Sequence, residues 1–264
     1  MVTAEMGLAG VRSSDRVEED SLRQESVSRC RQDRGVKVLL LCGGKGERLR
    51  PMTDSLPKPL VPIKDRPMLH YLIRQFESQG YRRFVVAVGY KAQTVVDYLK
   101  AHHAHLDIDI VDSGDADILQ RMRDSMPYLQ GDFIMCYGDT LADVNLKELA
   151  AFHRCHDGGV TITTFQLQVP FGVLRVGGSG RVHQFAEKPF LNEWINIGYY
   201  YFNRRTLPDL RRGRDLVGFL QTMIRRHELF AYKHLGIHIT VNTMKELQDA
   251  EKNISRFTRS CGMR

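Results

Sequence analysis

Residues 36–60, VKVLLLCGGKGERLRPMTDSLPKPL, join a continuous apolar run to a loop that is rich in glycine, proline and positive charge. An uninterrupted apolar run is typical of a β-strand that is covered on both faces, as in a parallel sheet. Glycines directly after such a strand let the backbone turn tightly and bring its N–H groups close to an anion. Ligands of open α/β sheets bind at this carboxyl edge, so the stretch predicts both a sheet and the position of a site.

Strands and helices alternate after this stretch. The pattern predicts strands at 83–89, 106–113 and 132–139, with helices at 67–80, 92–103 and 116–126. Parallel strands joined by helices form right-handed crossovers, which place helices on both faces of the sheet. The first half of the folded region is therefore predicted to be α/β.

The pattern changes after residue 139. Helices are predicted at 145–156, 215–226 and 244–254, but most other apolar segments in this half have the character of strands. GGSG at 177–180 is typical of a hairpin loop. We expect these strands to extend the sheet and to add a small antiparallel portion. The predicted fold is α/β, with a Rossmann-like mixed, mostly parallel sheet flanked by helices.

Composition places further limits on the protein. The 264 residues suffice for a substantial core without disulfides or metal ions. Residues 1–35 contain six arginines and seven acidic residues but few large apolar side chains, so we expect a flexible N-terminal extension before a folded domain at 36–264. The five cysteines form no C-x-x-C pair, which indicates reduced thiols in a cytoplasmic protein. No apolar run of about 20 residues is present, and we expect no membrane partner.

The formal net charge of +7 suits either nucleic acid or a phosphate-rich small molecule. Basic residues are scattered without an aromatic-interleaved stripe, so we expect no nucleic-acid partner. Four cations nevertheless gather in the quoted stretch: Lys45, Arg48, Arg50 and Lys58. Prolines stiffen this loop, which favours a defined place for each charge and predicts binding of a triphosphate. The glycine spacing matches neither the dinucleotide fingerprint nor the P-loop.

GGKGERLRPMTDSLPKPL, residues 43–60, resembles the signature G-G-x-G-[TS]-R-L-x-P-x-T-x(4-5)-P-K-P of sugar-1-phosphate nucleotidyltransferases, and the similarity continues to about residue 254. The resemblance implies a GT-A-like nucleotidyltransferase fold. It also implies that Gly43, Gly44 and Gly46 hold the nucleotide. Arg48 and Lys58 would be the catalytic cations that neutralise phosphate charge during transfer. Glu47 stands where the family usually has Thr or Ser.

An aspartate ends one of the predicted strands, in YGDTLADVNL at 137–146. A carboxylate at this edge is well placed to hold Mg²⁺, which prefers oxygen ligands and bridges substrate phosphates. The resemblance makes Asp139 a catalytic metal ligand, and this segment looks most like the glucose-1-phosphate cytidylyltransferase branch. Asn242 stands where the family has a second metal-binding Asp, so we expect Mg²⁺ to be held by Asp139 and Asn242. Asp143 is predicted to cap the following helix.

The resemblance also assigns residues to the sugar phosphate and to the base. The segments FGVLRV, FAEKP and INIGYYYF imply sugar-phosphate contacts by Gly172, Glu187, Lys188, Asn196 and Gly198. VDSGDADILQRM, at 111–122, resembles the cytidylyl pattern and implies that Ser113 and Gly114 lie near the base, with Arg121 as a further counterpart. The glycine pair that precedes this arginine in the family is absent.

These expectations converge on an enzyme that makes a nucleotide sugar and pyrophosphate from an NTP and a sugar-1-phosphate. CTP with glucose-1-phosphate is the pair that the sequence favours. The alternatives are another base (GTP, UTP or dTTP), another acceptor such as a cyclitol phosphate or a phosphonate, or a non-catalytic nucleotide-sugar sensor of the same fold. A homo-oligomer is compatible with the sequence. The three histidines at 102, 103 and 105 end a predicted helix and are expected to be solvated rather than to bind a metal.

Overall fold

The central strand, β1 (Lys37–Leu41), is the apolar run from which the sequence analysis started. Val38 and Leu40 lie in one cluster of buried residues and Leu39 lies in the other. Successive side chains of a strand point to opposite faces, so β1 is covered on both sides, as its composition predicts. The computed structural model describes residues 35–156 and 158–263; apart from Gly35, the predicted N-terminal extension lies outside them.

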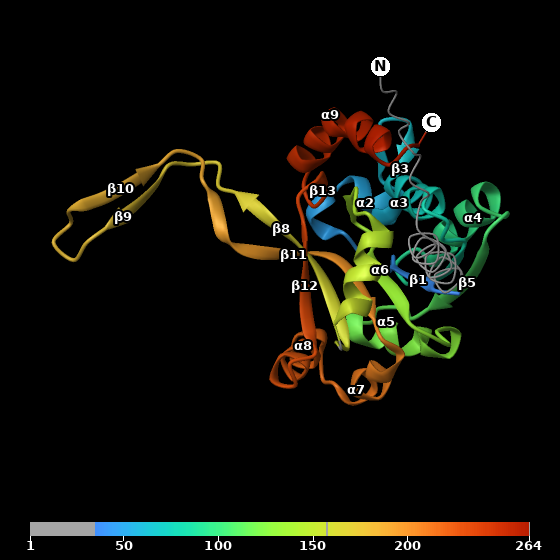
Figure 1. Ribbon diagram of the computed structural model, residues 1–264. Helices are drawn as coiled ribbons and strands as arrows, with labels where there is room; N and C mark the ends of the chain where they lie inside the picture. Colours follow the sequence, from blue (N-terminus) through green and yellow to red (C-terminus); the bar gives the residue numbers. More distant parts are fainter. Residues whose placement is uncertain (1–34, 157, 264) are drawn as a thin grey trace, which may run out of the picture. The chain divides into compact units, whose positions relative to one another are not determined.

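A seven-stranded sheet forms the framework of the unit that spans residues 36–264. Its strands are β1, β4 (Arg83–Val88), β5 (Asp107–Asp112), β6 (Phe133–Tyr137), β8 (Val160–Gln168), β11 (Phe190–Phe202) and β12 (Leu229–His234). Their order in space is β12-β8-β11-β6-β1-β4-β5 (Figure 1). β11 runs antiparallel to its neighbours β6 and β8, and the other four pairs are parallel. The prediction of a mixed, mostly parallel sheet is confirmed.

Helices cover both faces of the sheet. Buried residues of four helices join the cluster that contains Val38: α3 (Met68–Ser78), α4 (Ala92–His102), α6 (Leu146–Cys155) and α9 (Met244–Ser260). Three helices contribute to the opposite cluster: α5 (Ile118–Ser125), α7 (Leu207–Arg212) and α8 (Leu216–Arg225). Among the helices of the described residues, none is long and apolar enough to cross a lipid bilayer.

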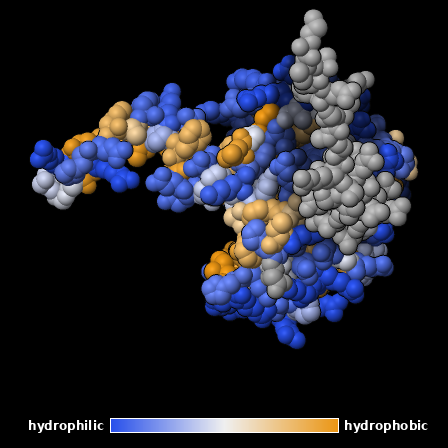
Figure 2. Space-filling model, viewed as in Figure 1, coloured by the Kyte–Doolittle hydropathy of each residue, from blue (hydrophilic) through white to orange (hydrophobic). Residues whose placement is uncertain are grey.

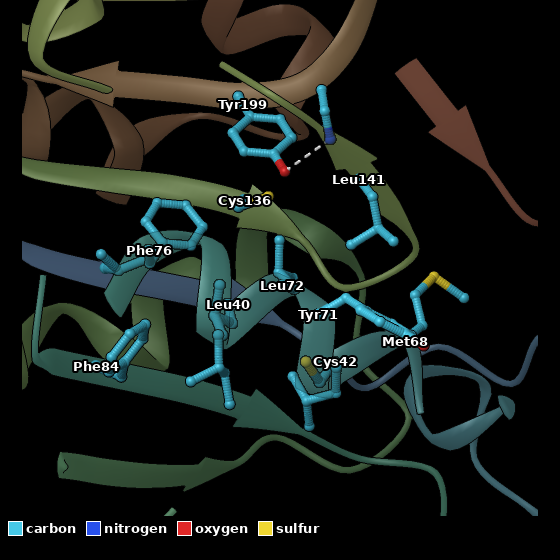
Figure 3. Close-up of a cluster of buried hydrophobic side chains, with 14 of the residues drawn as sticks. Leu40, Cys42, Met68, Tyr71, Leu72, Phe76, Phe84, Cys136, Leu141 and Tyr199 are labelled. Carbon is cyan, nitrogen blue, oxygen red and sulfur yellow. Dashed lines mark hydrogen bonds between the residues drawn. The ribbon is translucent and has the colours of Figure 1, made fainter. Parts of the chain in front are cut away.

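The larger cluster is tied to the sheet by a buried tyrosine (Figure 3). Tyr199 of β11 packs against Phe76 of α3, with nearly parallel rings. Its hydroxyl donates to Gln75 Oε1 at 2.8 Å and accepts from the Ala142 amide at 3.1 Å, and burial raises the pKa of this phenol well above its usual value. Cys136 lies buried in the same cluster, and its thiol is free, as predicted for the cysteines.

Shorter elements connect these layers. They are α2 (Met52–Ser55), the paired strands β2 (Pro62–Ile63) and β3 (Arg66–Pro67), and the antiparallel pair β7 (Thr140–Ala142) and β13 (His238–Thr240). The β7–β13 pair matters for function because it holds the chain after β6 next to the chain that leads into α9. These two segments are about 100 residues apart in sequence.

A two-stranded arm projects from the ends of β8 and β11 (Figure 1). It consists of β9 (Val173–Val176) and β10 (Val182–Ala186), paired antiparallel around the predicted GGSG turn. Apolar side chains are scattered along its surface (Figure 2), with Phe171 72% and Phe185 61% exposed. Neither buried cluster includes any residue from 166 to 194, so the arm lies outside the core.

Candidate active site

A cavity of about 660 Å³ opens at the carboxyl ends of β1 and β6. Its walls are formed by residues 41–44, 58–59, 116–119 with Arg121, 137–139 and 215–217. Charged and glycine-rich loops therefore surround a hollow at the sheet edge where the sequence predicts a site. The last wall segment, at the start of α8, was not predicted, because nothing in Asp215–Val217 distinguishes it from an ordinary helix start.

The glycine loop offers unpaired backbone donors. Within the described part of the chain, the amides of residues 43–46 have no hydrogen-bond acceptor, whereas the Gly46 carbonyl accepts from the Leu49 amide and the Thr53 hydroxyl. Gly46 has a φ of +66°, and an added Cβ would lie 2.9 Å from Lys58 Cβ. Only glycine adopts this conformation so close to the lysine turn without strain. The loop thus combines a fixed shape with several free N–H groups, an arrangement suited to phosphate.

Four predicted residues meet beside this loop. Lys58 is 8% exposed, and its Nζ lies 2.6 Å from Asp139 Oδ2 and 2.8 Å from Asn242 Oδ1. Arg48 Nη2 donates to the same Asn242 oxygen at 3.1 Å. The network carries two positive charges and one negative charge, so it remains cationic. An ammonium has three donors, which leaves Lys58 one for a ligand.

Asp139 owes its position to the glycine before it. The Gly138 amide donates to the Leu41 carbonyl at 3.0 Å, and an added Cβ at Gly138 would lie 2.7 Å from this oxygen and 2.8 Å from Cys42 Sγ. β6 can therefore approach the end of β1 this closely only with glycine at 138. Asp139 is thereby brought to the cavity that Gly43 and Gly44 also line.

Asn242 is positioned by the start of α9. Thr243 caps this helix by accepting from the Glu246 amide, and the Glu246 carboxylate accepts from the Asn242 amide in return. Glu246 thus reaches one residue further back than in a standard capping box, and the two hydrogen bonds together fix the backbone at the helix entry. The Asn242 side chain donates to Thr240 Oγ1 at 2.9 Å, which orients its Oδ1 toward the two cations.

Ser113 and Gly114 lie on the loop after β5, and the backbone amide of each donates a hydrogen bond. The Ser113 amide donates to the Val88 carbonyl, and the Gly114 amide donates to Asp112 Oδ1. The Ser113 hydroxyl is buried and has no partner among the described residues. Whether these two residues contact a base stays a prediction.

The predicted sugar-phosphate residues fall into two groups. Gly172, Glu187 and Lys188 lie at the base of the arm, where a Cβ on Gly172 would crowd Phe185 and lie 3.2 Å from Glu187 Oε2. Asn196 and Gly198 lie in β11, and the Gly198 amide donates to Asn196 Oδ1 at 2.9 Å. None of the five lines the cavity, so their proposed role in sugar binding stays a prediction.

The predicted role of Asp143 is corrected by the structure. Asp143 does not cap α6; the cap is Asn145, whose side chain accepts from the Lys147 and Glu148 amides. Asp143 is instead buried against His234. Burial alone would raise its pKa, but hydrogen bonds from His234, Ser260 and the Ile237 amide lower the pKa to about 2.

One of the three histidines at the end of α4 differs from the expectation of a solvated helix end. His103 is 1% exposed, and its two ring nitrogens have no partner among the described residues. His102 and His105 are exposed, as predicted. No group of three or more His, Cys, Asp or Glu side chains is arranged to hold a metal ion in the described parts of the chain.

Comparison with known proteins identifies the family. The model of the nucleotidyl transferase family matches residues 37–218, more than half of the chain. The chain belongs to the nucleotidyl transferase family. It is therefore a nucleotidyltransferase enzyme, which confirms the family resemblance in residues 43–60.

Several curated proteins resemble the chain. A probable glucose-1-phosphate cytidylyltransferase of Bacillus subtilis is 26% identical over 244 residues, which cover 82% of this chain and 95% of that protein. Mannose-1-phosphate guanylyltransferase 1 of Arabidopsis thaliana is 34% identical over 184 residues, covering 65% of this chain. The match spans only 51% of the guanylyltransferase, so the chain corresponds to about half of that protein.

Solved structures share the fold. HddC from Yersinia pseudotuberculosis superposes with a TM-score of 0.65 at 21% identity, covering 83% of this chain and 99% of that one. A putative glucose-1-phosphate thymidylyltransferase from Bacillus anthracis gives 0.69 at 17% identity, covering 87% and 100%. The predicted nucleotidyltransferase fold is confirmed.

Proposed function

We propose that this nucleotidyltransferase joins an NTP to a sugar-1-phosphate. A phosphate oxygen of the sugar phosphate attacks the α-phosphorus, the bond from that phosphorus to the bridging oxygen breaks, and pyrophosphate leaves. The product is a nucleotide sugar. Such a transfer depends mainly on positioning and on stabilising developing negative charge.

The observation that carries this proposal is the meeting of two anion-binding features at one cavity. Free backbone amides of the glycine loop lie beside a cationic network of Arg48, Lys58, Asp139 and Asn242. We assign the loop to the nucleotide phosphates, and Arg48 and Lys58 to the charge that develops on the transferred and leaving groups.

A divalent metal ion, which this family typically uses, fits the donor set at the cavity. Asp139 uses Oδ2 for Lys58, while its Oδ1 has no hydrogen-bond partner among the described residues. Mg²⁺ commonly uses one or two carboxylates, with water and substrate phosphates completing its coordination. We propose Asp139 as its protein ligand, with the Asn242 amide oxygen joining it in place of one of the two cations from which it now accepts. When bound, the ion would neutralise and orient the phosphates.

CTP and glucose-1-phosphate form the first substrate pair that we propose. The cytidylyltransferase relative from Bacillus subtilis is matched over 95% of its length, so the chain resembles that protein as a whole. GTP with mannose-1-phosphate is the second pair, since the guanylyltransferase from Arabidopsis thaliana is more identical over a shorter match.

A matrix of substrates tests both the reaction and the pair. Pyrophosphate release is measured for CTP, GTP, UTP, ATP and dTTP, each with glucose-1-phosphate, mannose-1-phosphate and a cyclitol phosphate, in the presence of Mg²⁺. We expect one pair to dominate and Lys58→Met to abolish its signal. Tight nucleotide-sugar binding without turnover of any pair would instead support a nucleotide-sugar sensor.

A further inference from the structure

A buried arginine in the wall of the cavity links three loops. Arg121 of α5 is 5% exposed, and its guanidinium donates to three backbone carbonyls: Val88 at 2.9 Å, Gly43 at 3.1 Å and Gly114 at 3.1 Å. These carbonyls lie at the carboxyl ends of β4, β1 and β5. One side chain thus joins the loops that follow three adjacent strands of the sheet.

Glycines make room for this guanidinium. An added Cβ on Gly43 would overlap Arg121 Nη1, and one on Gly89 would lie too close to both Nη1 and the Gly114 carbonyl. Gly114 itself has a φ of +58°, a conformation that favours glycine. Three glycines on three loops therefore enclose one planar cation.

The contact at Gly43 constrains the orientation of the peptide unit that joins Gly43 to Gly44. The Gly43 carbonyl accepts from Arg121 and also from the Tyr90 amide at 3.1 Å. The carbonyl oxygen and the following N–H point in opposite directions across a trans peptide. Holding the Gly43 carbonyl toward α5 therefore turns the Gly44 N–H away from α5, and Gly44 lines the cavity.

We propose that Arg121 is a positioning residue that presents the free amides of the glycine loop to the nucleotide phosphates. The effect of this role on catalysis rests on the proposed function. Its effect on the conformation of the glycine loop does not, because these hydrogen bonds are present in the protein without ligand. Within the described residues, the hydrogen bonds of the guanidinium are all to backbone carbonyls. The guanidinium reaches the three carbonyls from two nitrogens, Nη1 and Nη2, that are held in one plane, whereas a lysine ammonium would have to reach all three from a single nitrogen on a flexible stem.

The variant pair Arg121→Lys and Arg123→Lys tests this role. Arg123 lies on the same helix and also donates to backbone carbonyls, those of Leu210 and Gly213, but away from the glycine loop. Hydrogen exchange of the free proteins is followed in peptides that cover residues 42–49. We expect Arg121→Lys to speed exchange there at least ~5-fold and Arg123→Lys to leave it unchanged, because loosened contacts permit local opening.

Steady-state kinetics provide the second measurement. Loss of charge-assisted hydrogen bonds that orient the loop should raise the KM for NTP by about tenfold or more in Arg121→Lys, with little change in the KM for the sugar phosphate. Arg123→Lys should leave both constants near wild type. Equal exchange and equal NTP KM in Arg121→Lys and Arg123→Lys would overturn the proposal.

A second route to the same contact covers the case in which Arg121→Lys fails to fold. Gly89→Ala keeps the arginine but pushes its guanidinium away, and it should loosen residues 42–49 and raise the NTP KM in the same way. Unchanged exchange and NTP KM in folded Gly89→Ala would also refute the proposal. If the wild type turns over no substrate pair while either variant still loosens the loop, the proposed function fails and the positioning role stands.

Discussion

Lys58 is the residue on which the proposed chemistry depends most directly, because it touches both Asp139 and Asn242. Replacing it with methionine keeps much of the stem but removes the charge. We expect Lys58→Met to lower kcat/KM by roughly a thousandfold, or about 4 kcal/mol of transition-state stabilisation. Pyrophosphate release measures this loss, with Lys100→Met on the exposed side of α4 as the control. Retention of more than half of the activity by Lys58→Met would exclude a catalytic role.

Asn242 gives a second prediction at this scale. Its neutral oxygen accepts from Arg48 and Lys58, so an aspartate there would add a negative charge to a network that already contains Asp139. We expect Asn242→Asp to lower the Mg²⁺ concentration for half-maximal activity by about tenfold, since Mg²⁺ is held more strongly by charged oxygen ligands. Titration of activity with Mg²⁺ measures the shift. An unchanged Mg²⁺ requirement would show that residue 242 does not ligate the ion.

The sequence predicts the members of the charge network but not their contacts. Arg48 and Lys58 are recognisable because residues 43–60 resemble the family signature, and Asp139 because it ends a predicted strand. Arg121 is singled out by the resemblance to the cytidylyl pattern. Its hydrogen bonds to three loops, however, depend on strands that meet only in the folded sheet. Asp143 was misassigned because a carboxylate two residues before a helix-capping asparagine resembles a cap in sequence. Its actual partners, His234 and Ser260, lie far along the chain.

At the scale of elements, long periodic segments were predictable and short ones were not. Each helix of eight or more residues in the described chain was predicted, because its apolar positions recur at helical spacing. The pairing of β7 with β13 was not, since a strand of three residues carries no signal of a partner about 100 residues away. That pair nevertheless brings Asp139 and Asn242 together, so the part of the site that depends on it could not be derived from local pattern.

Histidines buried between elements lead to a pH prediction. Burial lowers the pKa of His103, His153 and His238 to about 4, from the usual 6.5. As the pH falls below 6.5, the unfolded chain takes up protons that the folded protein does not, so the free energy of unfolding falls until about pH 4. We expect the melting temperature to drop by about 10 °C between pH 7.5 and pH 5.

The variant His103→Leu isolates one of these groups. Both ring nitrogens of His103 are buried without a partner among the described residues, so an apolar side chain sacrifices no hydrogen bond there. Thermal melts should show a smaller loss on acidification in His103→Leu than in the wild type, whereas the exposed neighbour variant His102→Leu should follow the wild type. Parallel pH profiles for all three proteins would contradict the assignment of this loss to buried His103.

At the scale of the whole molecule, the framework and the arm are separable. Residues 36–264 form one compact unit, but the core clusters draw nothing from residues 166–194. The strands at the base of the arm are still paired, with Phe190 opposite Gln168 and the Val169 amide donating to the Pro189 carbonyl at 2.9 Å. The arm can therefore be shortened without disturbing the sheet that positions the cavity.

Replacing residues 171–187 with Asn-Gly should close the shortened strands with a two-residue hairpin turn. We expect the melting temperature to change by no more than about 2 °C, because few buried apolar contacts are lost. Nucleotide binding, followed by calorimetry, should persist. The KM for the sugar phosphate should rise at least ~10-fold, because the deletion removes Gly172 and Glu187. Loss of a hydrogen bond between protein and substrate costs about this much binding energy. Lys188→Met in the intact arm is the matched variant for the predicted phosphate contact.

A melting temperature lowered by more than about 10 °C would show that the arm belongs to the cooperative core. An unchanged sugar-phosphate KM would remove Gly172 and Glu187 from the site.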